Sequence, residues 1–388
     1  MIYKIEGFCK NIEDLSGVKS EEEFLDLIES GRITDEILST IFSGLRLELA
    51  KNLRLNHISF LMGNGCSIYA GSKSTQEFCI TDVVERDTLD VLPSSIERMM
   101  SNKQLEEVLN ALLTVQEFYH ITADEKESTV SKIIKKLKDH LLGNYVNSVK
   151  YDELLYHETL LLKLRSFGCL KKVKFYTLNY DLALEYVLDK LSIDYDNGFL
   201  GFINRKFDSR TLQSSDKTKL VKIHGSVNWV YDITDQSIKE TQPKFKKGKV
   251  EVEDAEHVLI YPTEQKIYQT YNAPYSELMR NMLNGFETGE NLILVLGYKY
   301  GDEHINEILY KAVANPNNVF YFFDYSGGAS SFIQKMMELS DNTQNINIFL
   351  GSVLGDFTKF VKYLMPANAE KTDEERIFEL LGKVLNHD

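Results

Sequence analysis

The sequence predicts an α/β protein: a Rossmann-like parallel sheet with an inserted helical subdomain and a helical N-terminal leader. Short apolar runs of strand length recur along the chain, bounded by Gly, Asn or Asp, which is typical of strands buried on both faces. Several runs are followed by segments of helical periodicity, and this alternation indicates a doubly wound sheet. With 43% hydrophobic residues, 22 Gly and 6 Pro in 388 residues, the chain can bury a sizeable core.

The domain organisation follows from where these patterns lie. Residues 1–54 are expected to form a helical segment of two helices, in which Ser20 and Glu23 make a capping box. Residues 55–365 are expected to form the Rossmann-like domain, with an all-helical insertion at about 90–168 after its first strand. Residues 366–388 are expected to hold a C-terminal helix that docks or oligomerises.

The expected elements of the sheet are short and evenly spread. Strands are predicted at 58–62, 173–178, 220–223, 258–261, 292–296, 319–323 and 346–350. Helices are predicted after several of them, at 182–191, 305–313, 332–339 and 357–363. Outside its strand, the polar segment 207–249 is interpreted as exposed loops, and Trp229, the single tryptophan, as a packing residue.

The charge balance restricts the class of partner. The chain has 44 Lys+Arg against 58 Asp+Glu, a formal net charge of −14, which argues against a general nucleic-acid or anionic-membrane binder. Basic runs at 132–138 and 243–249 permit only a local patch, so nucleic acid would be met indirectly or through that patch.

The cysteines indicate neither a disulfide framework nor a metal site. Cys9, Cys66, Cys79 and Cys169 stand far apart without a CxxC pair, so no zinc ribbon is predicted and no metal is expected. A reduced, cytoplasmic setting fits this pattern. The chain shows no signal peptide and no apolar stretch of about 18 residues, so no membrane association is expected.

The first candidate site is the turn after the strand at 58–62, which holds Gly63, Asn64, Gly65 and Ser67. Glycines directly after a buried strand let the backbone approach a pyrophosphate, whose charge is held by N–H groups at the next helix start. The dinucleotide fingerprint GxGxxG is not met, because Ile68 stands where its third glycine belongs. An ordinary strand-to-helix turn is the alternative.

The second and third candidates also follow strands. Asn179 and Asp181 lie at the end of the strand at 173–178, where α/β folds place their ligands, although one of the two is expected only to cap the next helix. His224 follows the strand at 220–223 and precedes a glycine, a position from which an imidazole can accept or relay a proton. A structural histidine is the alternative.

The fourth candidate is the turn after the strand at 292–296, with Gly297, Tyr298, Gly301 and Asp302. A glycine turn between a strand and a helix start suits a phosphate or ribose contact. Asp302 acting only as an N-cap is the alternative. His304 is expected on the helix surface.

Together, in this order, the four segments resemble the sirtuin-like family. GNGCSIYAG is similar to the family's GAGxSxxSG, TLNYD to TQNID, HGS contains the catalytic histidine, and LGYKYGDEHI resembles the late GYSFxDxxI turn. The resemblance covers roughly residues 56–310 and implies a sirtuin-like fold with NAD⁺ as substrate. The zinc ribbon and the Ile-Pro-Asp-Phe-Arg run after Gly71 are missing, which argues against a protein deacylase.

This zinc-less, helix-inserted form is similar to the sirtuin-like domains of bacterial antiphage systems. That resemblance implies an NAD⁺ hydrolase that yields nicotinamide and ADP-ribose and acts as an effector by depleting NAD⁺. It also implies a homo-oligomer and a HerA-type ATPase partner. The alternatives are a non-catalytic NAD⁺- or ADP-ribose-binding regulatory subunit and a nuclease-associated subunit of an ATPase complex.

The resemblance also implies roles for the candidate residues. Asn179 would hold the ribose hydroxyls and the attacking water, and His224 would act as general base. The turn from Gly63 to Ser67 would bind the pyrophosphate side. Asp181 and the turn from Gly297 to Asp302 would contact nicotinamide or the adenosine end.

Overall fold

An eight-stranded parallel sheet forms the centre of the protein, in the order β1-β15-β14-β13-β2-β3-β7-β4. The computed structural model describes residues 1–5, 7, 18–73, 80, 83, 92–102, 105–145, 148–213, 216–246, 248–251, 257–259 and 273–367. The strands of the sheet are β1 (Ile2–Tyr3), β2 (His57–Met62), β3 (Val173–Thr177), β4 (Tyr195–Asp196), β7 (Thr218–Lys222), β13 (Asn291–Leu296), β14 (Asn318–Asp324) and β15 (Ile346–Leu350). Six of the seven predicted strands lie in it, so the predicted parallel α/β class is confirmed.

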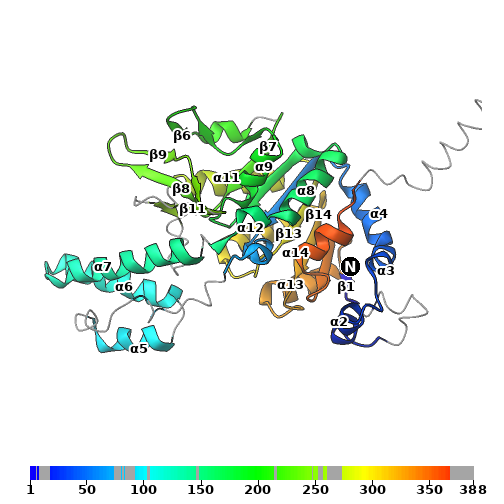
Figure 1. Cartoon of the computed structure of the whole chain (residues 1–388), viewed down its shortest axis with the longest axis horizontal. Helices are drawn as coiled ribbons and strands as arrows, with labels where there is room; N and C mark the ends of the chain where they lie inside the picture. The colour runs from blue at the N-terminus through cyan, green and yellow to red at the C-terminus, as the bar shows by residue number, and fades with distance from the viewer. Residues whose placement is uncertain are drawn as a thin grey trace, which may run out of the picture.

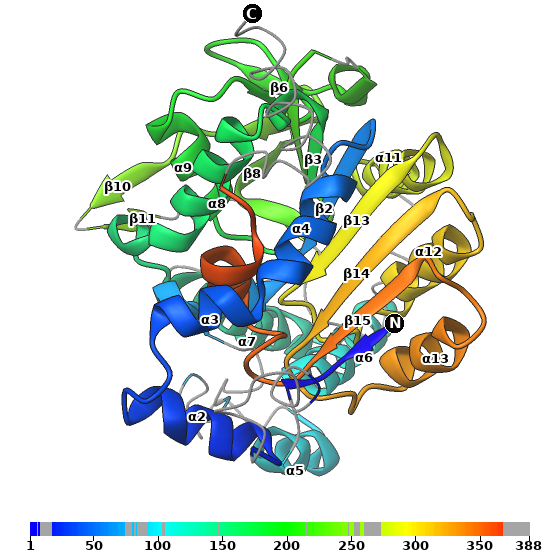
Figure 2. The ribbon, with the colours of Figure 1, turned by 90° about the vertical axis from the view of Figure 1, so that its right-hand side faces the viewer.

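Helices cover both faces of this sheet (Figure 2). One face carries α4 (Ser43–Asn52), α8 (Leu155–Ser166), α9 (Ala183–Lys190) and α14 (Phe357–Lys359), and the other carries α11 (Tyr275–Glu287), α12 (Glu303–Val313) and α13 (Ser331–Ser340). Along β2, Phe60 and Met62 enter the first core and Leu61 enters the second. Both sides of the strand are therefore apolar, which explains the continuous apolar runs in the sequence.

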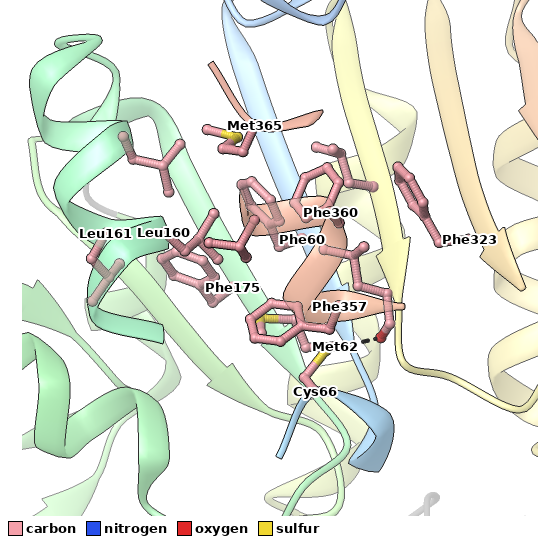
Figure 3. Packing of buried hydrophobic residues seen from close by; sticks show 14 of the residues in the cluster. Phe60, Met62, Cys66, Leu160, Leu161, Phe175, Phe323, Phe357, Phe360 and Met365 are labelled. Carbon is pink, nitrogen blue, oxygen red and sulfur yellow. Dashed lines mark hydrogen bonds between the residues drawn. The ribbon is translucent and has the colours of Figure 1, made fainter. Parts of the chain in front are cut away.

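The first of these cores joins distant parts of the chain (Figure 3). Phe60 of β2 and Phe175 of β3 stack at a ring distance of 5.3 Å. Leu160 and Leu161 of α8 and Phe357 of α14 pack over them. Although residues 155–166 lie within the range expected for the insertion, α8 covers the sheet as the helix that precedes β3.

The other inserted helices enclose a separate core. They are α5 (Ser94–Asn102), α6 (Leu105–Ile121) and α7 (Lys126–His140), and they project from the sheet (Figure 1). Leu109 and Leu112 of α6 pack with Ile133 and Leu137 of α7. None of the helices in the described ranges is long and apolar enough to cross a membrane.

The N-terminal segment belongs to the main core. It holds three helices, α2 (Glu21–Glu29), α3 (Asp35–Ile41) and α4, where two were predicted. Ser20 Oγ accepts a hydrogen bond from the Glu23 N–H at 3.2 Å, as the capping box predicts, while the Glu23 carboxylate accepts from the Lys19 N–H. Strand β1 was not predicted. The C-terminal helix predicted after residue 366 lies almost wholly outside the described residues.

Beside the main sheet lies an antiparallel sheet in the order β12-β8-β9-β6-β5. Its strands are β5 (Phe199–Leu200), β6 (Arg205–Phe207), β8 (Gly225–Asp232), β9 (Ser237–Glu240) and β12 (His257–Leu259), and a hairpin of β10 (Lys244–Lys246) and β11 (Lys249–Glu251) follows β9. Two expectations were wrong here. Segment 207–249 is not a set of exposed loops, and the run at 258–261 contributes to this sheet instead of the parallel one. The physical reason is that polar residues alternate with apolar ones such as Val227 and Trp229. The polar Ser226 and Asn228 are buried as well and bond each other, so a segment with the composition of a loop forms a buried strand.

Candidate functional site

The four candidate segments meet at the carboxyl edge of the parallel sheet. The pairing registers align the last residues of four neighbouring strands in one row: Leu296, Met62, Thr177 and Lys222. Two residues beyond this row stand four predicted site residues: Tyr298, Asn64, Asn179 and His224. The chain order reverses between β2 and β13, and α/β folds place their ligands at such a switch point.

The two glycine turns at this switch point touch each other through their backbones. The Gly63 N–H donates to the Leu296 carbonyl and the Gly65 N–H to the Gly297 carbonyl, both at 2.9 Å. A Cβ on Gly63 would lie 2.6 Å from Gly297 O, and one on Gly65 would lie 2.7 Å from Gly297 Cα. The glycines are therefore required for this close approach, and the N–H groups of Gly63 and Gly65 are engaged within the protein.

Gly297 gives a test of this packing. Its φ is +61°, and a Cβ there would lie 2.4 Å from the Cys66 nitrogen. We expect Gly297→Ala to lower the free energy of unfolding by more than about 2 kcal/mol, through left-handed strain and overlap. Gly301 has nothing within 4 Å of its Cβ position and no positive φ, so Gly301→Ala is the matched control, with a change below about 0.5 kcal/mol. Urea unfolding measures both, and equal losses would contradict this account.

Asn179 and Asp181 separate into two roles. Asp181 is buried, and its Oδ1 accepts from the N–H of Ala183, the first residue of α9, at 3.0 Å. It thus bonds the helix start from the position before the N-cap, Leu182. Asn179 instead turns across to the first glycine turn, where its Nδ2 donates to Ser67 Oγ at 3.3 Å. Asn64 lies in the same turn, and its Oδ1 accepts from Ser72 at 2.5 Å. Asn179, Ser67 and Asn64 therefore form the polar lining between β2 and β3.

His224 lies beside a second histidine, His304. His224 is buried, and its Nε2 lies 3.1 Å from Nε2 of His304. The expectation that His304 sits on the helix surface was wrong, because the first turn of α12 reaches over the carboxyl edge and leaves His304 half-buried. One nitrogen must donate and the other accept, so the two imidazoles share a single hydrogen between them.

The turn from Gly297 to Asp302 is held by Tyr298. Its hydroxyl accepts from the Asp302 N–H at 2.9 Å and donates to the Asp302 carbonyl at 3.1 Å. Burial raises the pKa of Tyr298 far above its usual value, so the phenol stays protonated. Asp302 occupies the N-cap position of α12 without a capping hydrogen bond from its side chain. Tyr298 thus shapes this part of the edge as a structural residue.

A buried ion pair stabilises the loop between β3 and α9, which holds Asn179. Lys222 has a side chain only 1% exposed, and its Nζ lies 3.0 Å from Glu185 Oε1. The same ammonium donates to the carbonyls of Tyr180 and Asp181. Burial raises the pKa of Glu185, and the charge of Lys222 opposes that rise. Sequence reasoning missed this pair, although a lysine inside an apolar strand was a signal for it.

His157 lies behind the same loop. Its Nδ1 is 2.8 Å from the Tyr69 hydroxyl, and burial lowers the pKa of His157 to about 4. His157, Asn179, Asp181 and Glu185 are among the residues that line a cavity of about 10 Å³. A cavity of that size holds roughly one water molecule.

The buried His157 predicts a pH dependence of stability. The folded state holds it neutral down to about pH 4, whereas the unfolded chain takes up a proton below about 6.5. The unfolded state therefore binds more protons in this window, and stability is lost as the pH falls from about 6.5 to about 4, by roughly 3 kcal/mol. His157→Gln, which cannot titrate, should show a smaller loss in urea unfolding between pH 7 and 4. Parallel curves for the two proteins would contradict this.

The described residues also include two of the four cysteines. Cys66 and Cys169 are buried and free, and burial raises the pKa of the Cys66 thiol well above its usual value. Cys9 and Cys79 lie outside the described residues. Across the described ranges, no group of three or more His, Cys, Asp or Glu side chains is placed to hold a metal ion.

Part of this chain is similar to a known family. Residues 173–349 match the family model of the SIR2-like domain. The matched segment runs from β3 to β15 and includes Asn179, His224 and the turn after β13, but not the glycine turn after β2. A comparison with the curated proteins returned no match.

Several solved structures of Sir2 proteins are also similar to this chain. A mutant Sir2 homologue in complex with 2′-O-acetyl ADP ribose is 12% identical, with a TM-score of 0.39, over 82% of this chain and 94% of the homologue. A complex of a Sir2 homologue with NAD is 12% identical, with a TM-score of 0.38, over 81% of this chain and 91% of the homologue.

Proposed function

We propose that this protein is an NAD⁺ hydrolase that cleaves NAD⁺ to nicotinamide and ADP-ribose. The observation that carries the proposal is the pairing register, in which the neighbouring strands β3 and β7 end side by side at Thr177 and Lys222. Asn179 and His224 each follow two residues after these ends. Neighbouring strands lie about 4.8 Å apart, so the two side chains can serve one reacting centre. Both residues lie within the SIR2-like segment, and both match motif positions of the sirtuin-like family.

The chemistry needs few groups from the protein. Nicotinamide leaves from a cationic pyridinium and departs neutral, so no carboxylic acid has to protonate the leaving group as in ordinary glycoside hydrolysis. The site must orient the ribose, stabilise an oxocarbenium-like carbon and deliver water. Because Ser67 accepts from Asn179 Nδ2, the Oδ1 of Asn179 is left to accept from a ribose hydroxyl or the attacking water.

His224 serves as the general base in this proposal. Its Nε2 is occupied by His304, so a ribose hydroxyl or water reaches that nitrogen only after His304 turns aside. In this proposal, a substrate hydroxyl or water replaces His304 as the hydrogen-bond partner of His224 Nε2. This contact also favours the alternative function, a non-catalytic subunit that binds NAD⁺ or ADP-ribose, because the resting arrangement leaves the base engaged.

The dinucleotide is proposed to lie over the carboxyl edge, along the row from His224 to Tyr298. Asn64 would face its pyrophosphate with its side chain, and Ser67, which is buried, would hold Asn179 beside it. The N–H groups of Gly63, Gly65 and Ser67 already donate within the protein. The start of α12 near Asp302 would favour a negative charge through its helix dipole.

The wider role is proposed from the motif resemblance. The chain would act in the cytoplasm as an antiphage effector that depletes NAD⁺, as a homo-oligomer that assembles with a HerA-type ATPase. Light scattering of the purified chain, alone and with such an ATPase, tests the assembly. A 44.6 kDa monomer under both conditions would contradict it.

The activity itself is tested by nicotinamide release. Purified protein, alone and with the ATPase, is incubated with NAD⁺, and nicotinamide and ADP-ribose are separated by chromatography. Equal amounts of both products are expected. A parallel incubation with an acetyl-lysine peptide would reveal deacylation instead. NAD⁺ binding without nicotinamide release under either condition would favour the non-catalytic alternative.

A further inference from the structure

A large cavity formed by described residues lies at the other edge of the sheet, where β2, β3 and β7 begin. Its volume is about 780 Å³, within the range of small-molecule sites. It is lined by Asn56, His57, Lys171, Lys172, Val173, Lys174, Ser209, Leu212, Gln213, Lys217, Lys219, Glu277, Arg280, Asn281, Asn284, Gly285 and Thr288. These residues come from the strand starts, from the segment after β6 and from α11, none of which supplies the carboxyl-edge site.

The lining of this amino-edge cavity is strongly basic. It holds five lysines and Arg280 against one carboxylate, Glu277, in a chain whose net charge is −14. Two of the lysines are neutralised nearby: Lys217 lies 3.1 Å from Asp194, and Lys219 lies 2.5 Å from Asp196. These two lysines therefore have carboxylate partners within the protein.

The other four cations are different. Within the described ranges, no hydrogen bond or ion pair engages the side chains of Lys171, Lys172, Lys174 and Arg280. Lys174 is the most informative, because it is half-buried on β3. Burial lowers its pKa, and the charge of Lys219 lowers it further. A half-buried ammonium without a counter-ion is costly unless an anion can approach it.

A glycine lets α11 approach β3 closely beside Lys174. Gly285 of α11 faces the strand, and a Cβ at this position would lie 3.6 Å from Lys174 Nζ and 2.4 Å from the Tyr176 hydroxyl. Glycine is unfavourable inside a helix, by roughly 1 kcal/mol relative to alanine, so its place here reflects this close approach. The positive charge of the cavity also affects His57. Burial lowers the pKa of His57, and the charges of Lys174 and Lys172 lower it further.

The cavity's chemistry narrows the class of ligand. Unpaired lysines and an arginine around a concave space match phosphate oxygens, which accept several charge-assisted hydrogen bonds. The described lining holds no Phe, Tyr or Trp, so it offers no stacking platform for single-stranded bases. We propose that the amino-edge cavity binds a small molecule with two or more phosphate groups, at a site separate from the carboxyl edge.

Titration calorimetry of the full chain with inorganic tripolyphosphate tests this proposal. We expect one binding event, which weakens at least tenfold in Lys174→Met and in Arg280→Gln and weakens as salt rises. Lys311→Met, which removes an exposed cation on α12, is the matched control and should bind like wild type. Urea unfolding should show that Lys174→Met is folded, since it removes a half-buried unpaired charge, and Lys174→Arg should retain binding.

Two further experiments distinguish the amino-edge cavity from the carboxyl edge and from a nucleic-acid surface. If Asn179→Ala abolished tripolyphosphate binding while Lys174→Met did not, the anion would occupy the carboxyl edge and the proposal would fail. The proposal would fail equally if a duplex oligonucleotide competed at lower concentration than tripolyphosphate, because the cavity would then belong to a nucleic-acid surface. The readout is binding alone, so it does not depend on NAD⁺ hydrolysis.

Discussion

Replacing His224 by alanine is expected to lower the turnover of NAD⁺ hydrolysis by about 10²- to 10⁴-fold while NAD⁺ affinity stays close to that of wild type. The general base acts on a proton in the transition state, whereas the dinucleotide is held mainly by the other residues of the carboxyl edge. Nicotinamide release under saturating NAD⁺ gives the turnover, and calorimetry gives the affinity. Wild-type turnover in His224→Ala would rule out its role as base.

His304→Ala is the companion variant. His304 lies 3.1 Å from the reactive nitrogen of His224 and engages it at rest, so removal of His304 opens that nitrogen to the substrate. We expect His304→Ala to retain NAD⁺ hydrolysis and to show a lower KM for NAD⁺. Loss of hydrolysis in this variant would show that His304 itself is needed at the site.

Lys222→Met is expected to lower the free energy of unfolding by about 3 to 5 kcal/mol, because it leaves the carboxylate of Glu185 buried without its partner. The loop with Asn179 should also loosen, since the ammonium bonds the carbonyls of Tyr180 and Asp181. Urea unfolding at pH 7 measures the loss. The double variant Lys222→Met with Glu185→Leu should recover most of the stability, and an equally unstable double variant would contradict the explanation.

The stability of the single variant Lys222→Met should also depend on pH, in a direction that can be worked out. Burial raises the pKa of Glu185 in the folded state above its ordinary value of 4.5, and loss of Lys222 removes the charge that opposes this rise. The folded state then binds more protons than the unfolded state, so stability falls as pH rises from about 4.5 through the raised pKa. Lys222→Met should therefore be closest to wild type in acid. A deficit that did not grow with pH would show that the carboxylate is not the cause.

The parallel sheet could be predicted because its strands are buried on both faces. The run from Ile58 to Met62 is apolar without alternation, and its Phe60 and Leu61 enter opposite cores. The antiparallel sheet was not predicted because polar residues alternate with apolar ones along β8. Trp229 is fully buried and the polar Ser226 and Asn228 are buried too, yet these two gave that segment the composition of a loop.

The candidate site was predictable to the level of the sheet edge. Asn179 and His224 follow strands that the sequence marks clearly, and parallel strands bring their carboxyl ends together. Contacts between separate elements could not be predicted. Whether His304 faces solvent or His224 depends on how far α12 reaches over the edge, and the pairing of Lys222 with Glu185 depends on how α9 lies on β7.

The separate core of α5, α6 and α7 has a mechanical consequence. The chain leaves the main body at Gly71 and returns at Lys150, whose N–H donates to the Ala70 carbonyl at 2.8 Å. The two ends of the inserted segment are therefore hydrogen-bonded to each other where they join the main body. Ser72, at this junction, bonds both Asn64 and the Ser67 carbonyl. A force applied to the projecting helices therefore acts on this junction, which lies close in sequence to Asn64 and Ser67, the polar lining beside Asn179.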